Sequence, residues 1–146
     1  MEPQLIDLIK SYLEHVNVVL VKLKSKVGPP LDSKSWQANI PENGEYPDLG
    51  ITEFHRHGVG MWAYIDDKFI DFDFYDSNFS EDNPDKFFTI DPGFLMYFIE
   101  SLGINNNNWT DYSLLKKELD KLGDKGILRC IEYKYYLTED LDALSK

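Results

Sequence analysis

The stretch that decides the fold runs from Phe54 to Tyr75 and reads FHRHGVGMWAYIDDKFIDFDFY. Two runs rich in β-branched and aromatic residues, 58–65 and 69–74, flank the polar turn Asp66–Asp67–Lys68. Such runs around a short polar turn are typical of a β-hairpin. We therefore expect a hairpin over residues 54–76, at the centre of the fold.

Residue parity across a two-residue turn assigns the two faces of this hairpin, because side chains alternate along a strand and directly opposed residues share a face. The expected core face is continuously apolar and holds Val59, Met61, Ala63, Ile65, Ile70, Phe72 and Phe74. The opposite face is half aromatic and half acidic and holds Gly58, Gly60, Trp62, Tyr64, Phe69, Asp71, Asp73 and Tyr75. In this scheme His57 takes the parity of the core face, opposite the two aspartates.

Helices are expected on both sides of the hairpin. Apolar residues recur at three- to four-residue spacing over 3–26, which predicts an amphipathic helix. The cluster of β-branched residues that begins at Val16 leaves a strand from about residue 17 as the alternative. Asp91–Pro92 is the N-cap and first-turn proline of a helix over 92–102, and Thr110 is the expected cap of a helix over 111–122.

The sequence thus predicts an α+β fold: a small antiparallel β-sheet built on the central hairpin and packed by three helices. A strand near the C-terminus joins the hairpin in that sheet, and residues 138–146 form either a short helix or a frayed tail. We expect a single domain over 1–146, divided into an N-terminal helix (1–27), a long loop (28–53), the hairpin (54–76), an acidic loop (77–90), two helices (91–123) and a strand (126–137).

Charge narrows the classes of partner. The chain has a formal net charge of −11 and a pI near 4.6. Nucleic acids and anionic membranes both require a basic surface, so neither is an expected partner, and a basic protein is the natural complement. A single cysteine, Cys130, fits a reducing compartment. Without a signal-peptide pattern or an apolar run of about 18–20 residues, we expect a cytoplasmic protein.

No catalytic motif stands out, because the chain has no glycine-rich phosphate loop, G-x-S-x-G, H-E-x-x-H or paired C-x-x-C. We therefore expect no cofactor, no catalytic residue and a protein-binding role. The candidate partner-binding residues are Trp62, Tyr64, Asp71, Asp73, Tyr75 and Asp76. The expected structural residues are His57, Gly58 and Gly60, with the glycines serving a bulge or a positive φ. The alternative is a metal-dependent hydrolase or small-ligand binder with His55, His57, Asp71 and Asp73 as ligands.

Four short motifs occur between residues 40 and 100: Ile40–Pro41 with Gly44, His57–Gly58–Val59–Gly60, Asp71–Phe72–Asp73–Phe74 and Phe94–Leu95. In these motifs the chain resembles a family of small uncharacterised bacterial proteins. Such families often lie among polymorphic-toxin loci, so the resemblance implies an immunity protein that neutralises a toxin. The long acidic insertion after Tyr75 departs from the family pattern, which has a short glycine-bearing turn there.

Overall fold

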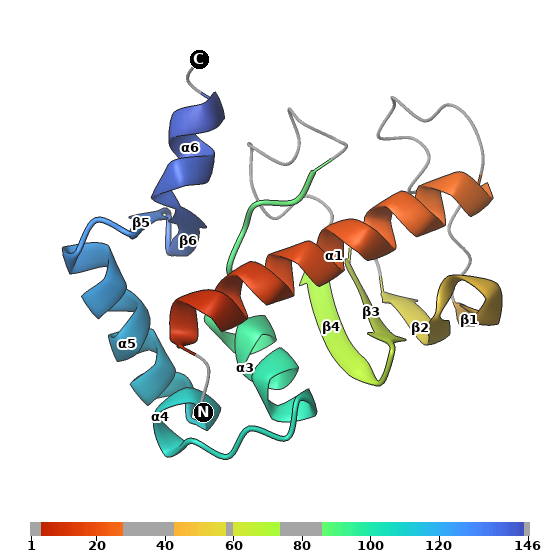
Figure 1. The fold of residues 1–146 in the computed structure, drawn as a ribbon, viewed down its shortest axis with the longest axis horizontal. Coiled ribbons are helices and arrows are strands. Elements are labelled where there is room, and N and C mark those ends of the chain that lie inside the picture. The colour runs from red at the N-terminus through yellow and green to blue at the C-terminus, as the bar shows by residue number, and fades with distance from the viewer. Residues whose placement is uncertain (1–3, 28–42, 58–59, 74–85, 145–146) are drawn as a thin grey trace.

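The computed structural model describes residues 4–27, 43–57, 60–73 and 86–144, and it has the expected α+β architecture (Figure 1). The helices are α1 (Leu5–Val27), α3 (Pro92–Ser101), α4 (Asn107–Thr110), α5 (Tyr112–Asp124) and α6 (Thr138–Leu144), with a 3-10 turn, η2, at Pro47–Leu49. The strands are β1 (Asn43–Tyr46), β2 (Ile51–His57), β3 (Gly60–Ile65), β4 (Lys68–Asp73), β5 (Leu128–Ile131) and β6 (Lys134–Leu137). Among these residues no helix is both long enough and apolar enough to cross a membrane.

The central hairpin is β3–β4, and its register is the predicted one. Ile65 pairs with Lys68 across a two-residue turn, where Asp66 and Asp67 have φ values of 50° and 67°. Aspartate tolerates this left-handed conformation because its short side chain can hydrogen-bond locally. The described residues of the predicted core face are all at most 2% exposed: Met61, Ala63, Ile65, Ile70 and Phe72. Val59 and Phe74 lie outside the described residues.

The sheet is larger than expected, because its strand order is β1-β2-β3-β4 and every neighbouring pair is antiparallel. The predicted loop over 28–53 is therefore wrong for residues 43–53, which contain β1, η2 and the start of β2. Residues 28–42 lie outside the described chain. The register shifts between Ile51 and Glu53 and again between Gly44 and Tyr46. A bulge interrupts the alternation of side chains, so these two strands lack the period-2 pattern by which a strand is recognised.

The continuous strand assumed through His57 is also wrong. Strand β2 ends at His57 and β3 begins at Gly60, so the chain reverses where the prediction assumed a continuous strand. His57 pairs with Gly60, and Gly60 pairs with Asp73. The parity that the prediction extended from β3 back to residue 57 therefore does not apply. The side chain of His57 and residues 58–59 lie outside the described chain.

The C-terminal strand does not join this sheet. Residues 128–137 form a separate hairpin, β5–β6, that reverses at Glu132 and Tyr133 with φ values of 52° and 70°. The predicted single strand over 126–137 is therefore wrong, because its apolar alternation belongs to two short strands. An isolated bridge between Ile90 and Tyr135 links β6 to the segment that precedes α3. After β6, residues 138–144 form a helix.

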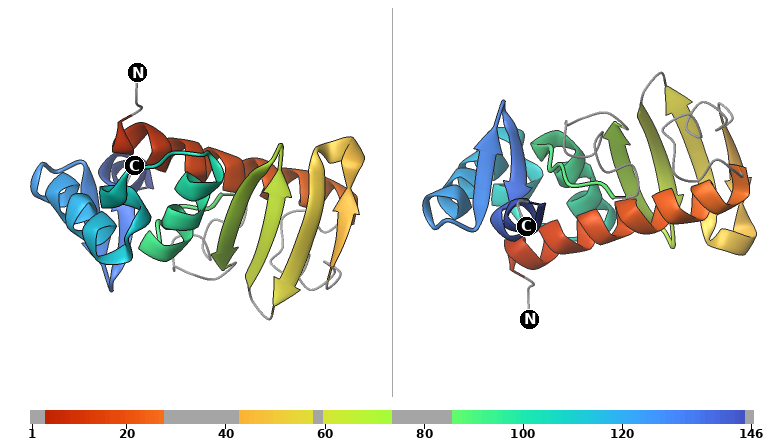
Figure 2. Two further views of the ribbon diagram at one scale, coloured as in Figure 1. Left: turned by 90° about the horizontal axis from the view of Figure 1, so that it is seen from below. Right: turned by 90° about the horizontal axis from the view of Figure 1, so that it is seen from above.

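Helix α1 lies along one face of the four-stranded sheet and reaches the C-terminal part of the molecule (Figure 2). It continues as a helix to Val27, which excludes the alternative strand from residue 17. The fully buried Tyr12 donates a hydrogen bond to the backbone oxygen of Asp71 over 2.7 Å. The amide of Asn17 contacts both the backbone N and O of Phe87, at 2.7 Å and 3.1 Å. These bonds fix the helix on β4 and on the segment before α3.

Two N-caps set the starts of the later helices. Asp91 accepts hydrogen bonds from the backbone N–H groups of Gly93 and Phe94, as predicted for α3. For α5 the cap is Asp111, which accepts from the N–H of Leu114, and the predicted cap Thr110 instead ends α4. Helix α3 lies beside β4, where it extends the layer of the sheet (Figure 2).

Candidate functional site

The face of the β1–β4 sheet that is turned away from α1, which we call the outer face, carries four of the six candidate partner-binding residues: Trp62, Tyr64, Asp71 and Asp73. Trp62 stands at its centre, with His55 as its partner on β2 and Asp71 as its partner on β4. Tyr64 is likewise flanked by Glu53 and Phe69. Because paired residues of neighbouring strands lie side by side, the sheet brings together residues from three strands.

The aromatic side chains of this face form a continuous row that crosses the strands and reaches α3. The ring of His55 stacks on Trp62 with centroids 4.2 Å apart, and Trp62 lies 5.7 Å from Phe69. Phe69 in turn lies 5.3 Å from Tyr64 and 6.2 Å from Tyr97. Tyr64 is 37% exposed and Tyr97 is 49% exposed. The aromatic row, His55, Trp62, Tyr64, Phe69 and Tyr97, is thus exposed at its two tyrosines and half-buried at its other three rings. Tyrosine and tryptophan rings of this kind are enriched at binding surfaces.

The charges on the outer face have one sign. Glu53, Asp71 and Asp73 share the outward register of the aromatic row, and Asp66 and Asp67 form the turn at one end of it. The basic residues of these strands have the opposite parity, since Arg56 pairs with Met61 and Lys68 with Ile65. Among the described residues of outward register in β2, β3 and β4, none is lysine or arginine. The face is therefore suited to a cationic partner.

The structure brings together four of the six residues predicted to bind a partner: Trp62, Tyr64, Asp71 and Asp73. The other two, Tyr75 and Asp76, lie outside the described residues, as does Gly58. Of the residues predicted to be structural, Gly60 is buried in the sheet beside Asp73. Sequence reasoning missed Tyr97. Tyr97 lies between Leu95 and Phe98 but does not belong to the buried stripe of α3. An aromatic residue outside the apolar stripe of a helix is the sequence signal that could have indicated it.

The alternative metal site is not assembled by the described side chains. Trp62 stands between His55 and Asp71, so β2 and β4 are separated by two strand spacings, or about 9–10 Å. The imidazole Nε2 of His55 lies 3.0 Å from Glu53 Oε1. No three His, Cys, Asp or Glu side chains gather for a metal in residues 4–27, 43–57, 60–73 and 86–144, where the side chain of His57 is not among those described.

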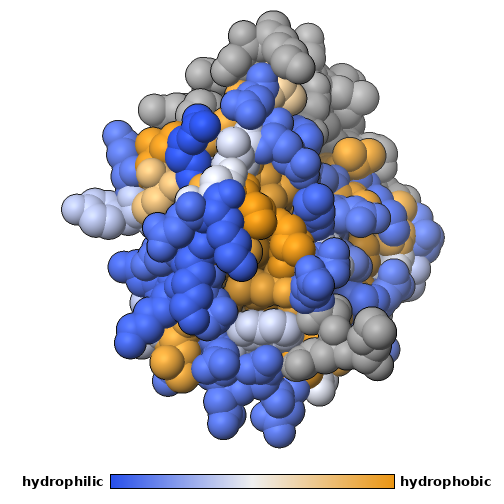
Figure 3. All heavy atoms as spheres, turned by 60° about the vertical axis from the view of Figure 1, so that its left-hand side comes forward, coloured by the Kyte–Doolittle hydropathy of each residue, from blue (hydrophilic) through white to orange (hydrophobic). Residues whose placement is uncertain are grey.

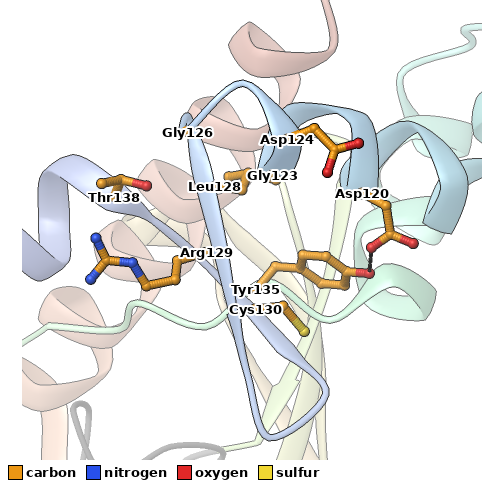
Figure 4. Close-up of a pocket in the computed structure, with 9 residues that line it drawn as sticks. All are labelled: Asp120, Gly123, Asp124, Gly126, Leu128, Arg129, Cys130, Tyr135 and Thr138. Atoms are coloured by element: carbon orange, nitrogen blue, oxygen red, sulfur yellow. Dashed lines mark hydrogen bonds between the residues drawn. The ribbon is translucent and has the colours of Figure 1, made fainter.

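A pocket of about 450 Å³ lies between α5 and the β5–β6 hairpin (Figure 4). On one side Tyr135 donates a hydrogen bond to Asp120 Oδ1 over 2.5 Å, and Arg129 and Thr138 lie on the other. Burial raises the pKa of Tyr135 above its usual range, and the Asp120 carboxylate raises this pKa further. A tyrosine that holds its proton this firmly is a poor general acid, and because it stays protonated at neutral pH it is not available as a base. Its hydrogen bond instead joins β6 to α5.

A second pocket, of about 430 Å³, adjoins the first, since Gly126 and Thr138 line both. Its apolar lining comes from Ile6, Ile127 and Leu137. Lys10 and Glu139 stand at its edge and form an ion pair of 3.4 Å. Figure 3 faces this end of the molecule, where hydrophobic side chains show in a hollow between hydrophilic ones. Both pockets lie away from the outer face.

Comparison with known proteins yields a family and no function. No curated protein and no solved structure matches the chain. One family profile, described as "Domain of unknown function (DUF6896)", matches residues 5–138. This range runs from the start of α1 to the end of the β5–β6 hairpin. It therefore includes the whole outer face, and the chain belongs to the DUF6896 family.

Proposed function

We propose that this protein is a non-enzymatic protein-binding module whose outer face docks on a basic protein. The observation that carries the proposal is the partly exposed aromatic row among carboxylates, with no lysine or arginine of outward register in the described parts of β2, β3 and β4. Aromatic side chains supply most of the affinity in typical interfaces, since they bury much area at little cost in side-chain entropy.

The acidic groups have a separate part in this proposal. Glu53, Asp71 and Asp73 lie beside the aromatic row, and the whole chain has a formal net charge of −11. Charges of one sign at the edge of an interface accelerate the encounter with an oppositely charged partner and exclude partners of like charge. The aromatic row therefore contributes affinity, whereas the carboxylates contribute association rate and choice of partner.

The scaffold suits a binding surface because its backbone is held on the far side. Tyr12 and the apolar face of the hairpin attach β3 and β4 to α1, so the outer face is pre-organised. A pre-organised surface loses little conformational entropy when a partner binds. We propose in particular an immunity protein that neutralises a basic toxin in the cytoplasm. The motifs at Gly44, Gly60 and Asp71–Asp73 resemble those of a family of small uncharacterised bacterial proteins. Such families often lie among polymorphic-toxin loci, which supports this role.

The test is the affinity of the purified protein for basic proteins encoded by neighbouring genes, measured by biolayer interferometry. We expect at least one of them to bind, and the D71N/D73N variant to bind it about tenfold more weakly, since each lost charge pair is worth roughly 0.7 kcal/mol. Both substitutions preserve side-chain shape. The hydrogen bond from Tyr12 also survives, because it goes to the backbone oxygen of Asp71.

The matched control is D124N/D142N, which removes the same two charges from exposed positions on α5 and α6. It changes net charge as much as D71N/D73N does but leaves the outer face intact. We expect its affinity to stay close to that of the wild type. Equal affinities for both double variants would refute the assignment of the outer face, and the absence of any basic partner would refute the proposed function.

A further inference from the structure

We infer that the rings of Tyr64, Phe69 and Tyr97 form an aromatic corner that receives an arginine side chain of the partner. The inference rests on the proposed function and names the chemical group that the outer face recognises. Phe69 lies between the two tyrosines, with interplanar angles of 60° to Tyr64 and 85° to Tyr97. Rings set steeply to one another present π-faces and ring edges to a group that approaches from solvent.

The corner is built from two elements that are joined by specific hydrogen bonds. The backbone N–H of Phe69, on β4, donates to Ser101 Oγ over 3.0 Å. The same hydroxyl donates to the backbone oxygen of Phe98 over 2.6 Å. Ser101 thereby fixes the C-terminal end of α3 against the start of β4, one helical turn from Tyr97. The backbone that carries Tyr97 is thus held beside Phe69 before any partner arrives.

The helix itself directs Tyr97 outward. Leu95, Phe98 and Ile99 are all fully buried, which leaves Tyr97 on the opposite side of α3 at 49% exposure. Tyr64 is 37% exposed on the other flank of Phe69. The two tyrosines are therefore accessible to a side chain from solvent, with the half-buried Phe69 between them.

Carboxylates surround this corner. Asp71 lies two residues after Phe69 on the same face of β4, and Glu53 pairs with Tyr64. Glu100 is exposed one turn after Tyr97 on α3. An aromatic face attracts a cation through its quadrupole, and a neighbouring carboxylate adds a charge-assisted hydrogen bond. The surroundings of the corner thus select a positively charged group.

Arginine fits this corner better than the other cations of proteins do. A guanidinium is planar and weakly hydrated, so it can stack on one ring while its N–H groups reach carboxylates in the same plane. The lysine ammonium is strongly hydrated and gains less on a surface that stays open to water. Quaternary ammonium groups are typically bound in enclosed aromatic cages, whereas two of these three rings are more than one-third exposed.

The experiment is an NMR titration with the peptide acetyl-Gly-Arg-Gly-Arg-Gly-amide, compared with its citrulline and lysine versions. Citrulline keeps the shape of arginine without its charge. We expect the arginine peptide to shift the ring resonances of Tyr64, Phe69 and Tyr97. Its affinity should exceed that of the citrulline peptide by about three- to tenfold, which is the range for an exposed cation–π contact with a nearby carboxylate. Equal binding of all three peptides would overturn the inference.

Variants of Tyr97 test the role of the ring. We expect Y97L to lose the preference for arginine and Y97F to keep it, because phenylalanine retains the π-face. Y112L is the matched control, since Tyr112 is 51% exposed on α5, outside the outer face. An arginine preference that survives in Y97L, or that Y112L loses equally, would overturn the inference.

The same variants separate this inference from the proposed function. If D71N/D73N weakens binding of the basic protein while Y97L leaves it unchanged, the outer face is the interface but the arginine corner is wrong. If neither variant changes that affinity, both the inference and the proposed function are wrong. Weakening by both variants, but by neither control, supports both.

Discussion

Gly44 shows how one residue sets the packing of the edge strand. A Cβ at this position would lie 2.9 Å from Cε1 of Phe54, which is fully buried and stacks on Tyr46 with centroids 5.6 Å apart. No side chain fits there unless the aromatic pair moves. The glycine in the motif that begins with Ile40–Pro41 therefore has a packing explanation and need not touch a ligand.

The raised pKa of Tyr135 makes the stability of the folded protein depend on pH. Burial, and secondly the Asp120 carboxylate, raises its pKa above the unfolded value of about 10. When folding raises the pKa of a group, the group makes its full contribution to stability at pH values below its unfolded pKa. That contribution is lost as the pH rises through the folded pKa. We therefore expect the wild type to lose stability relative to Y135F above pH 10, by up to about 1.4 kcal/mol per pH unit.

Urea unfolding of the two proteins between pH 7 and pH 11 measures this effect. At pH 7 we expect Y135F to be less stable by about 1 kcal/mol, because the hydrogen bond to Asp120 is lost. Lysines also titrate in this range, but they do so equally in both proteins. A difference in stability that stays constant up to pH 11 would contradict the assignment of a protonated, hydrogen-bonded tyrosine.

Two hairpin turns of similar geometry differ in their chemistry. Asp66–Asp67 and Glu132–Tyr133 each join two strands through two residues of positive φ. Left-handed backbone costs roughly 1–2 kcal/mol for an ordinary residue, and asparagine and glycine relieve that cost. Tyr133 is 89% exposed, so packing does not compensate for its strain. We expect E132N/Y133G to raise the free energy of unfolding by about 1–2 kcal/mol.

Urea denaturation of this variant, compared with D66N/D67G, is the appropriate measurement. The second variant should gain less, because aspartate already tolerates positive φ. If both variants gained the same free energy of unfolding, then the residue types Glu132 and Tyr133 would not be the cause of strain at the β5–β6 turn. A loss of stability in E132N/Y133G would mean that the side chains of this turn contribute to the fold.

The turns also explain which elements could be predicted from the sequence. Helices α1 and α3 and the β3–β4 hairpin follow from strong periodicity, from the Asp91–Pro92 cap and from a polar turn. Strands β1 and β2 were missed because each contains a register shift that interrupts the alternation. The β5–β6 reversal was missed because Glu132–Tyr133 carries no turn signal, and two short strands then look like one long strand.

At the scale of the whole molecule, one face of the sheet is packed on the core and the opposite face carries the aromatic row. Helix α1 covers one face of the sheet (Figure 2). The register of the strands places the aromatic row on the other face. The composition of the outer face could be predicted from the sequence, because a two-residue turn and a period of two fix which residues share it. Its extent could not, since Tyr97 joins the row through the packing of α3 on β4 and His55 joins it through β2.

The measurement that tests the central claim most directly is fluorine NMR of the protein labelled with 5-fluorotryptophan, recorded with and without a bound basic partner. The chain has three tryptophans, and single Trp→Phe variants assign their signals. Trp62 lies in the aromatic row, whereas Trp109 is 9% exposed on α4. We predict that the partner shifts the Trp62 signal and leaves the Trp109 signal in place. A saturated complex with an unshifted Trp62 signal would contradict the claim that the outer face is the binding surface.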